Sequence, residues 1–158
     1  MEKRLRHLLV TNSPEETVEA GRLLGSSLRP GDIAALTGEL GSGKTVFTKG
    51  IAAGLGYDKS DFVTSPTYKI LNQYEGRVKI NHFDAYRLNG PGDFFEIGGG
   101  DLLKNDSICV IEWAERVAGA LPEYAIHVYL RIMQSSTREI EFSLPENRKE
   151  LINTLAGK

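Results

Sequence analysis

One short element constrains this chain more than any other feature of its sequence. Residues 38–45 read GELGSGKT, a match to the P-loop pattern G-x-x-x-x-G-K-S/T. In a P-loop, glycines let successive backbone N–H groups turn toward phosphate oxygens and form an anion-binding nest. Lys44 adds a cation near the β- and γ-phosphates, and the hydroxyl of Thr45 suits the coordination shell of Mg²⁺. The element therefore predicts a binding site for a nucleoside triphosphate.

The residues on either side of this element are those that a P-loop requires. Residues 32–37, DIAALT, form a strand-like run before it. Phe47, Ile51 and Leu55 follow on one face of a helix that Gly56 ends. The start of such a helix presents unpaired N–H groups and the positive end of its dipole to a phosphate. The strand–loop–helix order indicates an α/β fold.

Composition indicates a single globular domain. A length of 158 residues fits one domain, residues 1–158, around one hydrophobic core. The 19 Lys and Arg residues and 21 Asp and Glu residues give a formal net charge of -2, and the two signs are interspersed. Without a basic face, direct and unaided binding to nucleic acid is not favoured.

Two further features favour a soluble protein of the cytoplasm. The single cysteine, Cys109, lies inside an apolar run, which predicts a buried, inert thiol and excludes an internal disulfide. Near the N-terminus, basic residues are followed by the short apolar run 8–10 before a polar stretch begins. That run is far too short for a signal peptide or a membrane span.

The segment SPEE at 13–16 is typical of a helix start. Ser13 is the expected N-cap, and Glu16 occupies the capping-box position. The helix is expected to run to about Leu28. Gly21 and Gly25 lie one turn apart on it and predict a face packed closely against the sheet.

The remaining pattern predicts a mixed sheet. Alternation with a short polar break indicates hairpins at 68–86 and 126–144. The continuously apolar run 108–111 indicates a strand buried on both faces. A last helix is expected near 146–155, and the three glycines at 98–100 predict a flexible loop. The expected fold class is α/β, a P-loop NTPase-like three-layer fold with a mixed parallel and antiparallel sheet flanked by helices.

Glu112 is the first candidate for the carboxylate that a P-loop enzyme needs opposite its threonine. It directly follows the run 108–111, where a buried strand ends at the ligand-binding edge of an α/β sheet. The alternative is that Glu112 caps a helix beginning near Trp113. We favour the metal-binding interpretation.

Asp84 is the second candidate carboxylate. Strand alternation in the segment HFDAYR at 82–87 places His82, Asp84 and Tyr86 on one face. This row is either part of a shared site or an exposed hairpin face, and the sequence leaves both open. A metal site at His82 is disfavoured, because neither another histidine nor Cys109 lies at ligand spacing from it.

Hydroxyl residues follow the P-loop at a distance that suits a switch. Thr64, Ser65 and Thr67 lie about 20 residues beyond Lys44, in a loop long enough to fold back over the γ-phosphate. The competing interpretation, slightly preferred from sequence alone, is that Pro66 fixes the start of the next strand.

The expected nucleotide is ATP. GTPases of the Ras type read guanine with an N/T-K-x-D element. The nearest string here, DKSD at 58–61, has the wrong first residue and follows the P-loop too soon.

In chain order, these segments resemble the TsaE (YjeE) family, small bacterial ATPases required for making N6-threonylcarbamoyladenosine in tRNA. The resemblance covers roughly residues 11–144. Five segments carry it: SPEET at 13–17, LGSGKT at 40–45, SPTY at 65–68, HFDAYRL at 82–88 and IEWAER at 111–116. The chain departs from the family at Val46, where a second threonine is common, and at 94–100, where a Leu- and Glu-rich helix is frequent.

The resemblance implies a set of site residues. Thr45 and Glu112 serve Mg²⁺, Asp84 lies near it, and the loop 65–67 is switch-like. Together with Lys44, the two carboxylates form the expected catalytic set. Contacts to the base or sugar are implied from the region of residues 13–17. The expected nucleotide contacts are Ser13, Thr17, Glu39, Leu40, Gly41, Ser42, Gly43, Lys44, Thr45 and Val46.

The resemblance also implies partners. Members of the family join the TsaB and TsaD subunits, and their ATP hydrolysis resets that complex between catalytic cycles; tRNA is only an indirect partner. The isolated chain is expected to be a weak ATPase, because the P-loop itself holds no arginine. Arg87 and Arg116, just beyond the two carboxylates, are the candidates to act in cis. Two rival interpretations stay open, a small-molecule kinase and a nucleotide-binding adaptor without turnover.

Overall fold

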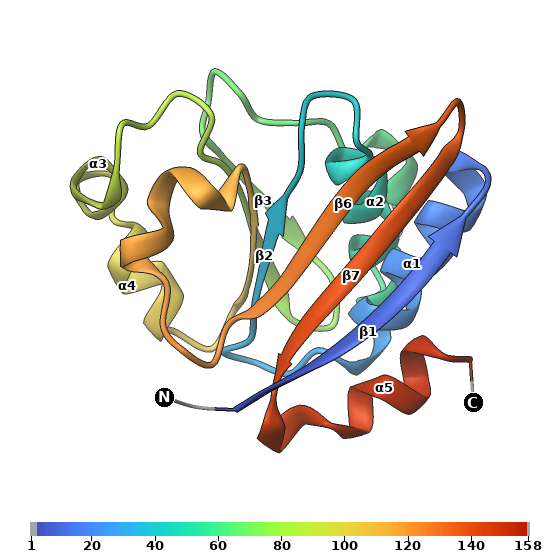
Figure 1. Ribbon diagram of the computed structural model, residues 1–158. Coiled ribbons are helices and arrows are strands. Elements are labelled where there is room, and N and C mark those ends of the chain that lie inside the picture. The colour runs from blue at the N-terminus through green and yellow to red at the C-terminus, as the bar shows by residue number, and fades with distance from the viewer. Residues whose placement is uncertain (1–2, 158) are drawn as a thin grey trace.

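The structure, a computed structural model, describes residues 3–157 and consists of a seven-stranded sheet with helices on both faces (Figure 1). The strands are β1 (Arg4–Thr11), β2 (Ile33–Thr37), β3 (Leu71–Glu75), β4 (Lys79–Asp84), β5 (Ile108–Glu112), β6 (Ile126–Gln134) and β7 (Thr137–Pro145). The α-helices are α1 (Pro14–Ser27), α2 (Lys44–Gly54), α3 (Pro91–Glu96), α4 (Gly99–Lys104) and α5 (Glu150–Leu155). Short 3₁₀ helices lie at Ser60–Phe62, Ala114–Ala120 and Glu146–Arg148.

The sheet is mixed, with the strand order β1-β7-β6-β2-β5-β4-β3. At its centre β2 pairs in parallel with both β6 and β5, and β5 pairs in parallel with β4. Antiparallel pairs flank this centre, β1 with β7 and β7 with β6 on one side and β4 with β3 on the other. Every residue of β5 is buried. This confirms the strand buried on both faces that its continuous apolar run predicts.

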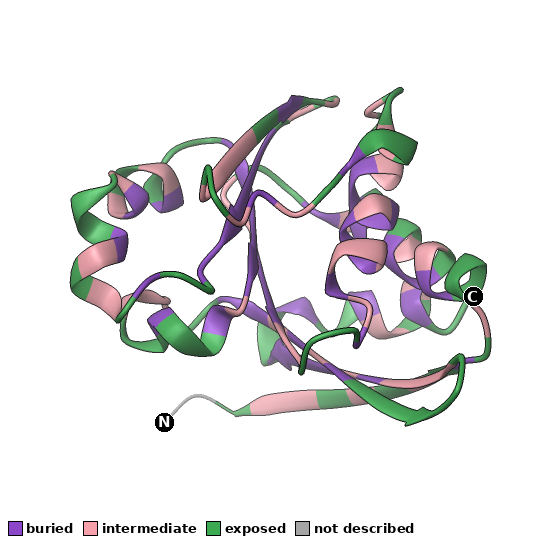
Figure 2. Cartoon of the chain, turned by 90° about the horizontal axis from the view of Figure 1, so that it is seen from above, coloured by how far each residue is buried: buried purple, intermediate pink, exposed green. Residues whose placement is uncertain are grey.

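Two hydrophobic clusters hold the layers together. The larger one lies between the sheet and helices α1, α2 and α5, and it includes Leu24, Phe47 and Phe142. The smaller one lies on the opposite face, where Phe83 of β4 packs with Phe94 of α3, Leu103 of α4 and Val117 of the 3₁₀ helix at 114–120. Figure 2 shows buried residues along the sheet between the two groups of helices. The architecture is the three-layer α/β fold that the sequence predicts.

Helix α1 begins as expected. The Oγ of Ser13 accepts a hydrogen bond from the backbone N–H of Glu16 (3.1 Å), so Ser13 is the N-cap. The carboxylate of Glu16 accepts from the N–H of Asn12 (3.0 Å) rather than from that of Ser13. The reciprocal bond of the capping box is therefore shifted by one residue. The helix ends at Ser27.

The two glycines of α1 do pack closely, but their neighbour is α2 and not the sheet. A Cβ on Gly21 would lie 2.2 Å from the carbonyl oxygen of Phe47, and a Cβ on Gly25 would lie 2.3 Å from that of Ile51. Gly50 and Gly54 of α2 face α1 in the same manner. The glycines therefore let the two helix backbones touch.

Residues 98–100 are not a flexible loop. Gly98 has a left-handed backbone (φ 87°) and precedes α4, which begins at Gly99. A Cβ on Gly99 would lie 2.4 Å from a ring atom of Phe94. The glycines at this point serve close packing between α3 and α4, which their sequence alone does not distinguish from flexibility.

One strand and two element boundaries also differ from expectation. The sequence does not predict β1, because basic residues and the exposed Leu8 and Val10 obscure its alternation. The first hairpin is shorter than 68–86, with strands of 71–75 and 79–84. The last helix begins only at Glu150, after a 3₁₀ turn.

In the described part of the chain, no helix has both the length and the apolar character needed to cross a membrane.

Candidate nucleotide-binding site

The P-loop connects the end of β2 to the start of α2. Gly41 (φ 81°) and Gly43 (φ 105°) adopt a left-handed backbone, which glycine takes without the strain of a Cβ. A Cβ on Gly38 would lie 2.4 Å from Oγ of Ser42 and 2.7 Å from the carbonyl oxygen of Leu130. The path of the loop therefore requires all three glycines.

Lys44 is buried at the first position of α2, with 5% of its surface exposed. Its Nζ donates to the carbonyl oxygens of Gly38 and Glu39 (3.1 Å for Glu39) and lies 3.9 Å from the ring centroid of Trp113. Burial lowers the pKa of Lys44, and the nearby carboxylate of Glu112 opposes this shift. The ammonium group is thus held beside the loop in a largely desolvated position.

Thr45 and Glu112 meet across the site. The Oγ1 of Thr45 donates a hydrogen bond to Oε1 of Glu112 (2.9 Å). The parallel pairing of β2 with β5 places Leu36 opposite Glu112, so the end of β5 lies beside the P-loop. Glu112 does not cap a helix: Trp113 has a left-handed backbone (φ 57°), and no side chain caps the 3₁₀ helix that follows. The helix-cap interpretation is therefore wrong.

A threonine hydroxyl and a carboxylate are hard oxygen donors of the kind that Mg²⁺ takes alongside phosphate oxygens and water. Among residues 3–157, no group of three or more His, Cys, Asp and Glu side chains could hold a metal ion by itself. The pair of Thr45 and Glu112 therefore fits an ion that completes its coordination shell from a nucleotide.

Asp84 ends β4 directly opposite Glu112 in the parallel register, and it is buried. Its Oδ2 accepts hydrogen bonds from the hydroxyls of Ser65 and Thr67 (2.9 Å for Thr67). Its Oδ1 accepts from the backbone N–H of Tyr86 (2.9 Å). The exposed-face interpretation is wrong for His82 and Asp84, because residues 80 to 84 of β4 are all buried.

The loop after α2 reaches the site through these hydroxyls. Strand β3 begins only at Leu71, so Pro66 does not open the strand directly. Ile70 has a left-handed backbone (φ 71°), a strained conformation for a β-branched residue. Its carbonyl oxygen accepts from the N–H of Asp84 (2.9 Å). Asp84 therefore holds the loop at two points, through its side chain and through its backbone.

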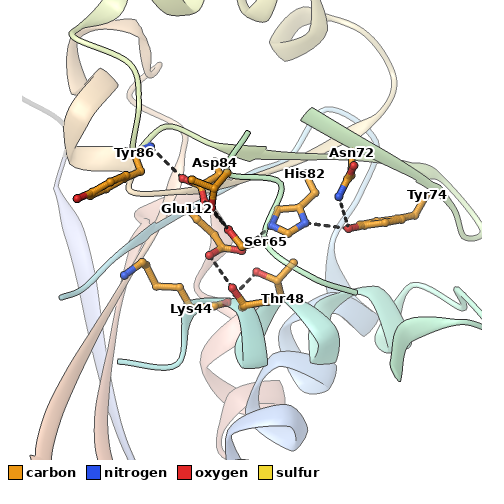
Figure 3. A network of polar contacts seen from close by, with 11 residues as sticks. Lys44, Thr48, Ser65, Asn72, Tyr74, His82, Asp84, Tyr86 and Glu112 are labelled. Atoms are coloured by element: carbon orange, nitrogen blue, oxygen red, sulfur yellow. Dashed lines mark hydrogen bonds and ion pairs between the residues drawn. The ribbon is translucent and has the colours of Figure 1, made fainter. Parts of the chain in front are cut away.

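His82 lies two residues before Asp84 on β4 and is fully buried. Its Nε2 is 2.5 Å from Oε2 of Glu112 (Figure 3). The sequence places His82 in the row of Asp84 but does not reveal this partner, because neither strand alone shows that β4 pairs with β5. Tyr86, the third residue of the row, lies beyond the end of β4, and its ring is half-exposed.

A cavity of about 450 Å³ lies over these residues, within the usual size range of small-molecule sites. A smaller cavity of about 110 Å³ lies between the P-loop and the start of α1. The larger cavity is lined by Leu40, Gly41, Gly43, Lys44, Thr45, Val46, Ser65, Thr67, Asp84, Tyr86, Glu112 and Trp113. The smaller one is lined by Pro14, Thr17, Gly41, Gly43, Val46, Ser136 and Arg138.

Most of the contacts expected from the sequence line one of the two cavities. Thr17 lines the smaller cavity, and its hydroxyl also forms a hydrogen bond with the hydroxyl of Thr11 (2.8 Å). Ser13, Glu39 and Ser42 line neither cavity. The Ser13 hydroxyl caps α1, the Glu39 side chain is exposed, and the buried Oγ of Ser42 has no hydrogen-bond partner within residues 3–157. Their part in nucleotide binding stays a prediction.

Arg138 is a site residue that the sequence does not reveal. It lies on β7, and one of its guanidinium nitrogens donates to the carbonyl oxygen of Gly41 in the P-loop (3.2 Å). In the sequence it is only one of several charged residues on an alternating strand. The contact depends on how the hairpin of β6 and β7 packs beside β2, which no local pattern shows.

The fold and the site define the class of protein. A P-loop joins the central parallel strand to α2, and its threonine faces a carboxylate at the end of the adjacent parallel strand. This is the arrangement of the P-loop nucleotide-binding proteins.

Comparisons with known proteins specify the family. The family model described as "Threonylcarbamoyl adenosine biosynthesis protein TsaE" matches residues 11–140. The chain is 43% identical to the tRNA threonylcarbamoyladenosine biosynthesis protein TsaE of Treponema pallidum over 131 residues. These residues are 83% of this chain and 96% of that protein. The protein of the same name from Bacillus subtilis is 34% identical over 143 residues, which are 90% of this chain and 88% of that protein. The crystal structure of Bacillus subtilis YdiB matches with a TM-score of 0.73 and 32% identity, covering 99% of this chain and 96% of that one. The chain belongs to the TsaE family.

Proposed function

We propose that this chain binds ATP with Mg²⁺ in the larger cavity and hydrolyses it in support of threonylcarbamoyladenosine synthesis in tRNA. The observation that carries the proposal is the contact between Thr45 and Glu112 (2.9 Å), which joins the P-loop to the end of β5 at the wall of that cavity. The names of the relatives from Treponema pallidum and Bacillus subtilis supply the pathway.

The chain's own residues divide the work in this proposal. Backbone N–H groups of the P-loop bind the phosphates, and Lys44 exchanges its contacts with two loop carbonyls for phosphate oxygens. Thr45 and Glu112 hold Mg²⁺. When bound, the ion draws negative charge from the phosphate oxygens. Asp84 supports the site from β4 by holding Ser65 at the wall of the cavity.

The smaller cavity is the proposed place for the sugar or base. It shares Gly41, Gly43 and Val46 with the larger cavity, so one ligand can extend from one into the other. Thr17 and Arg138 line its remaining wall. Ser13 contributes by starting the helix that carries Thr17.

Hydrolysis is proposed to be slow in the isolated chain and faster when the TsaB and TsaD subunits are bound. An arginine supplied to a P-loop site raises the hydrolysis rate by about 10³ to 10⁵. Among the described residues, no arginine lines the larger cavity. Arg87 and Arg116 instead lie over the rings of Tyr68 and Tyr86, at 5.3 and 5.1 Å. The formal net charge of -2, with basic and acidic residues interspersed along the chain, is consistent with tRNA as an indirect partner.

The proposal is tested by ATP hydrolysis measured with the chain alone and with TsaB and TsaD. We expect a weak, magnesium-dependent rate that the partners increase, and its loss in Lys44→Ala. Lys49→Ala is the matched control, because Lys49 lies on the same helix and lines neither cavity. A strain carrying Lys44→Ala is expected to lose threonylcarbamoyladenosine over repeated catalytic cycles.

Equal rates with and without partners, together with undiminished tRNA modification in the Lys44→Ala strain, contradict the proposal. Transfer of the γ-phosphate to a small metabolite would then favour a kinase.

A further inference from the structure

Glu112 carries the proposed magnesium site, and both of its oxygens already have partners. Oε1 accepts from Thr45 (2.9 Å), and Oε2 is 2.5 Å from Nε2 of His82. Thr45 lines the larger cavity, whereas His82 has no exposed surface and does not line it. His82 is therefore out of reach of a nucleotide and can act on the site only through Glu112.

The contacts continue from His82 to β3, on the side away from the cavity. Nδ1 of His82 is 3.0 Å from the hydroxyl oxygen of Tyr74, and that oxygen is 3.5 Å from Nδ2 of Asn72 (Figure 3). The Tyr74 ring is itself held by stacking on Tyr57, with 5.0 Å between ring centroids. A row of polar groups, buried except for the half-buried Asn72 at its start, thus runs from the edge strand β3 through β4 to the end of β5.

For a neutral imidazole at His82, the donors and acceptors along this row fit one tautomer. An ionised carboxylate only accepts hydrogen bonds, so Nε2 must carry the hydrogen that points to Glu112. In the neutral ring Nδ1 is then an acceptor, which takes the hydroxyl hydrogen of Tyr74. The Tyr74 oxygen in turn accepts from the Asn72 amide. Every bond in the row has one donor and one acceptor, and all of them point toward Glu112.

We propose that His82, fixed in this tautomer by Tyr74, is a positioning residue that orients the Glu112 carboxylate for Mg²⁺. The inference rests on the proposed function, in which Glu112 is a ligand of that ion. With Oε2 held by His82, Oε1 is left facing Thr45 and the cavity. Partners of this kind fix the orientation of metal-binding side chains, and their loss typically lowers metal affinity about 10- to 100-fold.

The first test measures the tautomer itself, without nucleotide or metal. Side-chain ¹⁵N spectra of the full chain are expected to show His82 with hydrogen on Nε2, the signal being assigned by its absence in His82→Gln. Tyr74→Phe removes the donor to Nδ1 and is expected to change that signal, whereas Tyr57→Phe is not. A hydrogen on Nδ1 in the wild-type protein would overturn the inference.

The second test measures the Mg²⁺ concentration that half-saturates binding of a non-hydrolysable ATP analogue. His82→Leu is expected to raise this concentration about tenfold or more, and Tyr74→Phe about threefold. His82→Gln retains a terminal N–H donor and is expected to recover much of the affinity. Affinity for the analogue without Mg²⁺ should stay the same in all variants, because none of these side chains lines the cavity.

The outcomes separate this inference from the proposed function. If the wild-type chain binds the analogue with no dependence on Mg²⁺, the proposed function fails and the inference fails with it. If wild-type binding depends on Mg²⁺ but Tyr74→Phe and folded His82→Leu keep the same half-saturation, only the role of His82 is overturned. Tyr74→Phe decides the matter even if His82→Leu does not fold, since it retains the ring that stacks on Tyr57.

Discussion

The ammonium group of Lys44 donates to two carbonyl groups of its own loop, and these bonds do not fully replace the water it has lost. Burial is the largest cause of its lowered pKa, ahead of the opposing attraction from Glu112. The charged form is therefore less favourable in the folded chain than in water. Phosphate oxygens would offset this loss, which is why the residue suits binding better than stability.

Because burial of the Lys44 charge is unfavourable without phosphate, Lys44→Met is expected to have opposite effects on binding and on stability. Without its cation, affinity for an ATP analogue should fall by about one to two decades, since a charged contact contributes roughly 1.5 to 3 kcal/mol. The midpoint of urea unfolding of the nucleotide-free protein should rise. A titration of binding and an unfolding curve on the same sample check both effects, and a lower midpoint would contradict the second.

The pH dependence of that stability difference follows from the direction of the shift. The folded-state pKa of Lys44 lies below its ordinary value of 10.5. Between those two values the unfolded chain binds the proton more strongly, so wild-type stability gains from rising pH. The advantage of Lys44→Met should accordingly shrink as pH rises through the lowered pKa toward 10.5. Unfolding curves at neutral and alkaline pH measure it.

The residue-level site could be predicted where a local pattern and a strand end coincide. Lys44 and Thr45 follow from the P-loop, and Glu112 follows from its place directly after a buried strand. His82 and Arg138 could not be assigned their contacts, because those depend on strand pairing between distant segments. The sequence also left Asp84 undecided between a shared site and an exposed face.

The two carboxylates are expected to fail in different ways when neutralised. Glu112→Gln should weaken the dependence of binding and hydrolysis on Mg²⁺, because its oxygen contacts Thr45. Asp84→Asn should chiefly release the loop at 64–70, whose hydroxyls donate to Oδ2. Hydrogen exchange across that loop and magnesium titrations measure the two effects. Full magnesium-dependent turnover in Glu112→Gln, with none in Asp84→Asn, would reverse the assignment.

At the scale of elements, contact between the backbones of α1 and α2 fixes the direction of the P-loop helix. A Cβ on Gly50 would lie 2.0 Å from the carbonyl oxygen of Val18 and 2.8 Å from the N–H nitrogen of Arg22, so neither helix can adjust through a flexible side chain. Since α2 begins with Lys44 and Thr45, which both line the larger cavity, this packing positions the wall of that cavity.

Gly50→Ala is expected to destabilise the fold by about 1 to 3 kcal/mol, the usual cost of overpacking, despite the better helix propensity of alanine. Gly92→Ala is the matched control, because Gly92 lies in α3 and a Cβ there would meet nothing within 4 Å. Denaturant unfolding of both variants measures the contrast. Equal stability would show that α1 and α2 can separate without loss.

Elements could be predicted from the sequence where their side chains follow a clear period. Hairpins and the buried strand β5 follow from side-chain periodicity, which directly reflects which face is covered. Strand β1 has an outer face that mixes Arg6 with Leu8 and Val10, so its period is obscured. Close packing at Gly21 and Gly25 is predicted correctly, but the predicted partner, the sheet, is wrong and the actual one is α2. A glycine pattern does not say which backbone comes near.

At the scale of the whole molecule, the site and a buried ion-pair cluster around Arg148 lie at opposite ends of the central strands. The site gathers where β2, β4 and β5 end. At the other end, the buried Arg148 pairs with Asp32 (2.6 Å) and Glu150 (2.9 Å) and donates to the carbonyl oxygen of Ser27 (3.2 Å). It thereby ties α1, the start of β2 and α5 together. We therefore expect mutations to affect stability and binding separately.

Thermal unfolding with a magnesium-bound ATP analogue is expected to separate them. A ligand at 100 times its Kd stabilises the folded state by about 2.7 kcal/mol, which raises the Tm of a domain of this size by roughly 5 to 10 °C. Arg148→Ala leaves Asp32 without its partner, so it should lower stability by about 3 kcal/mol yet keep that ligand-induced shift. Lys44→Ala should retain a folded core but lose most of the shift, since its change lies in the site. Loss of the shift in Arg148→Ala at a saturating analogue concentration would show that the two ends are coupled, because the linkage depends only on ligand concentration and affinity.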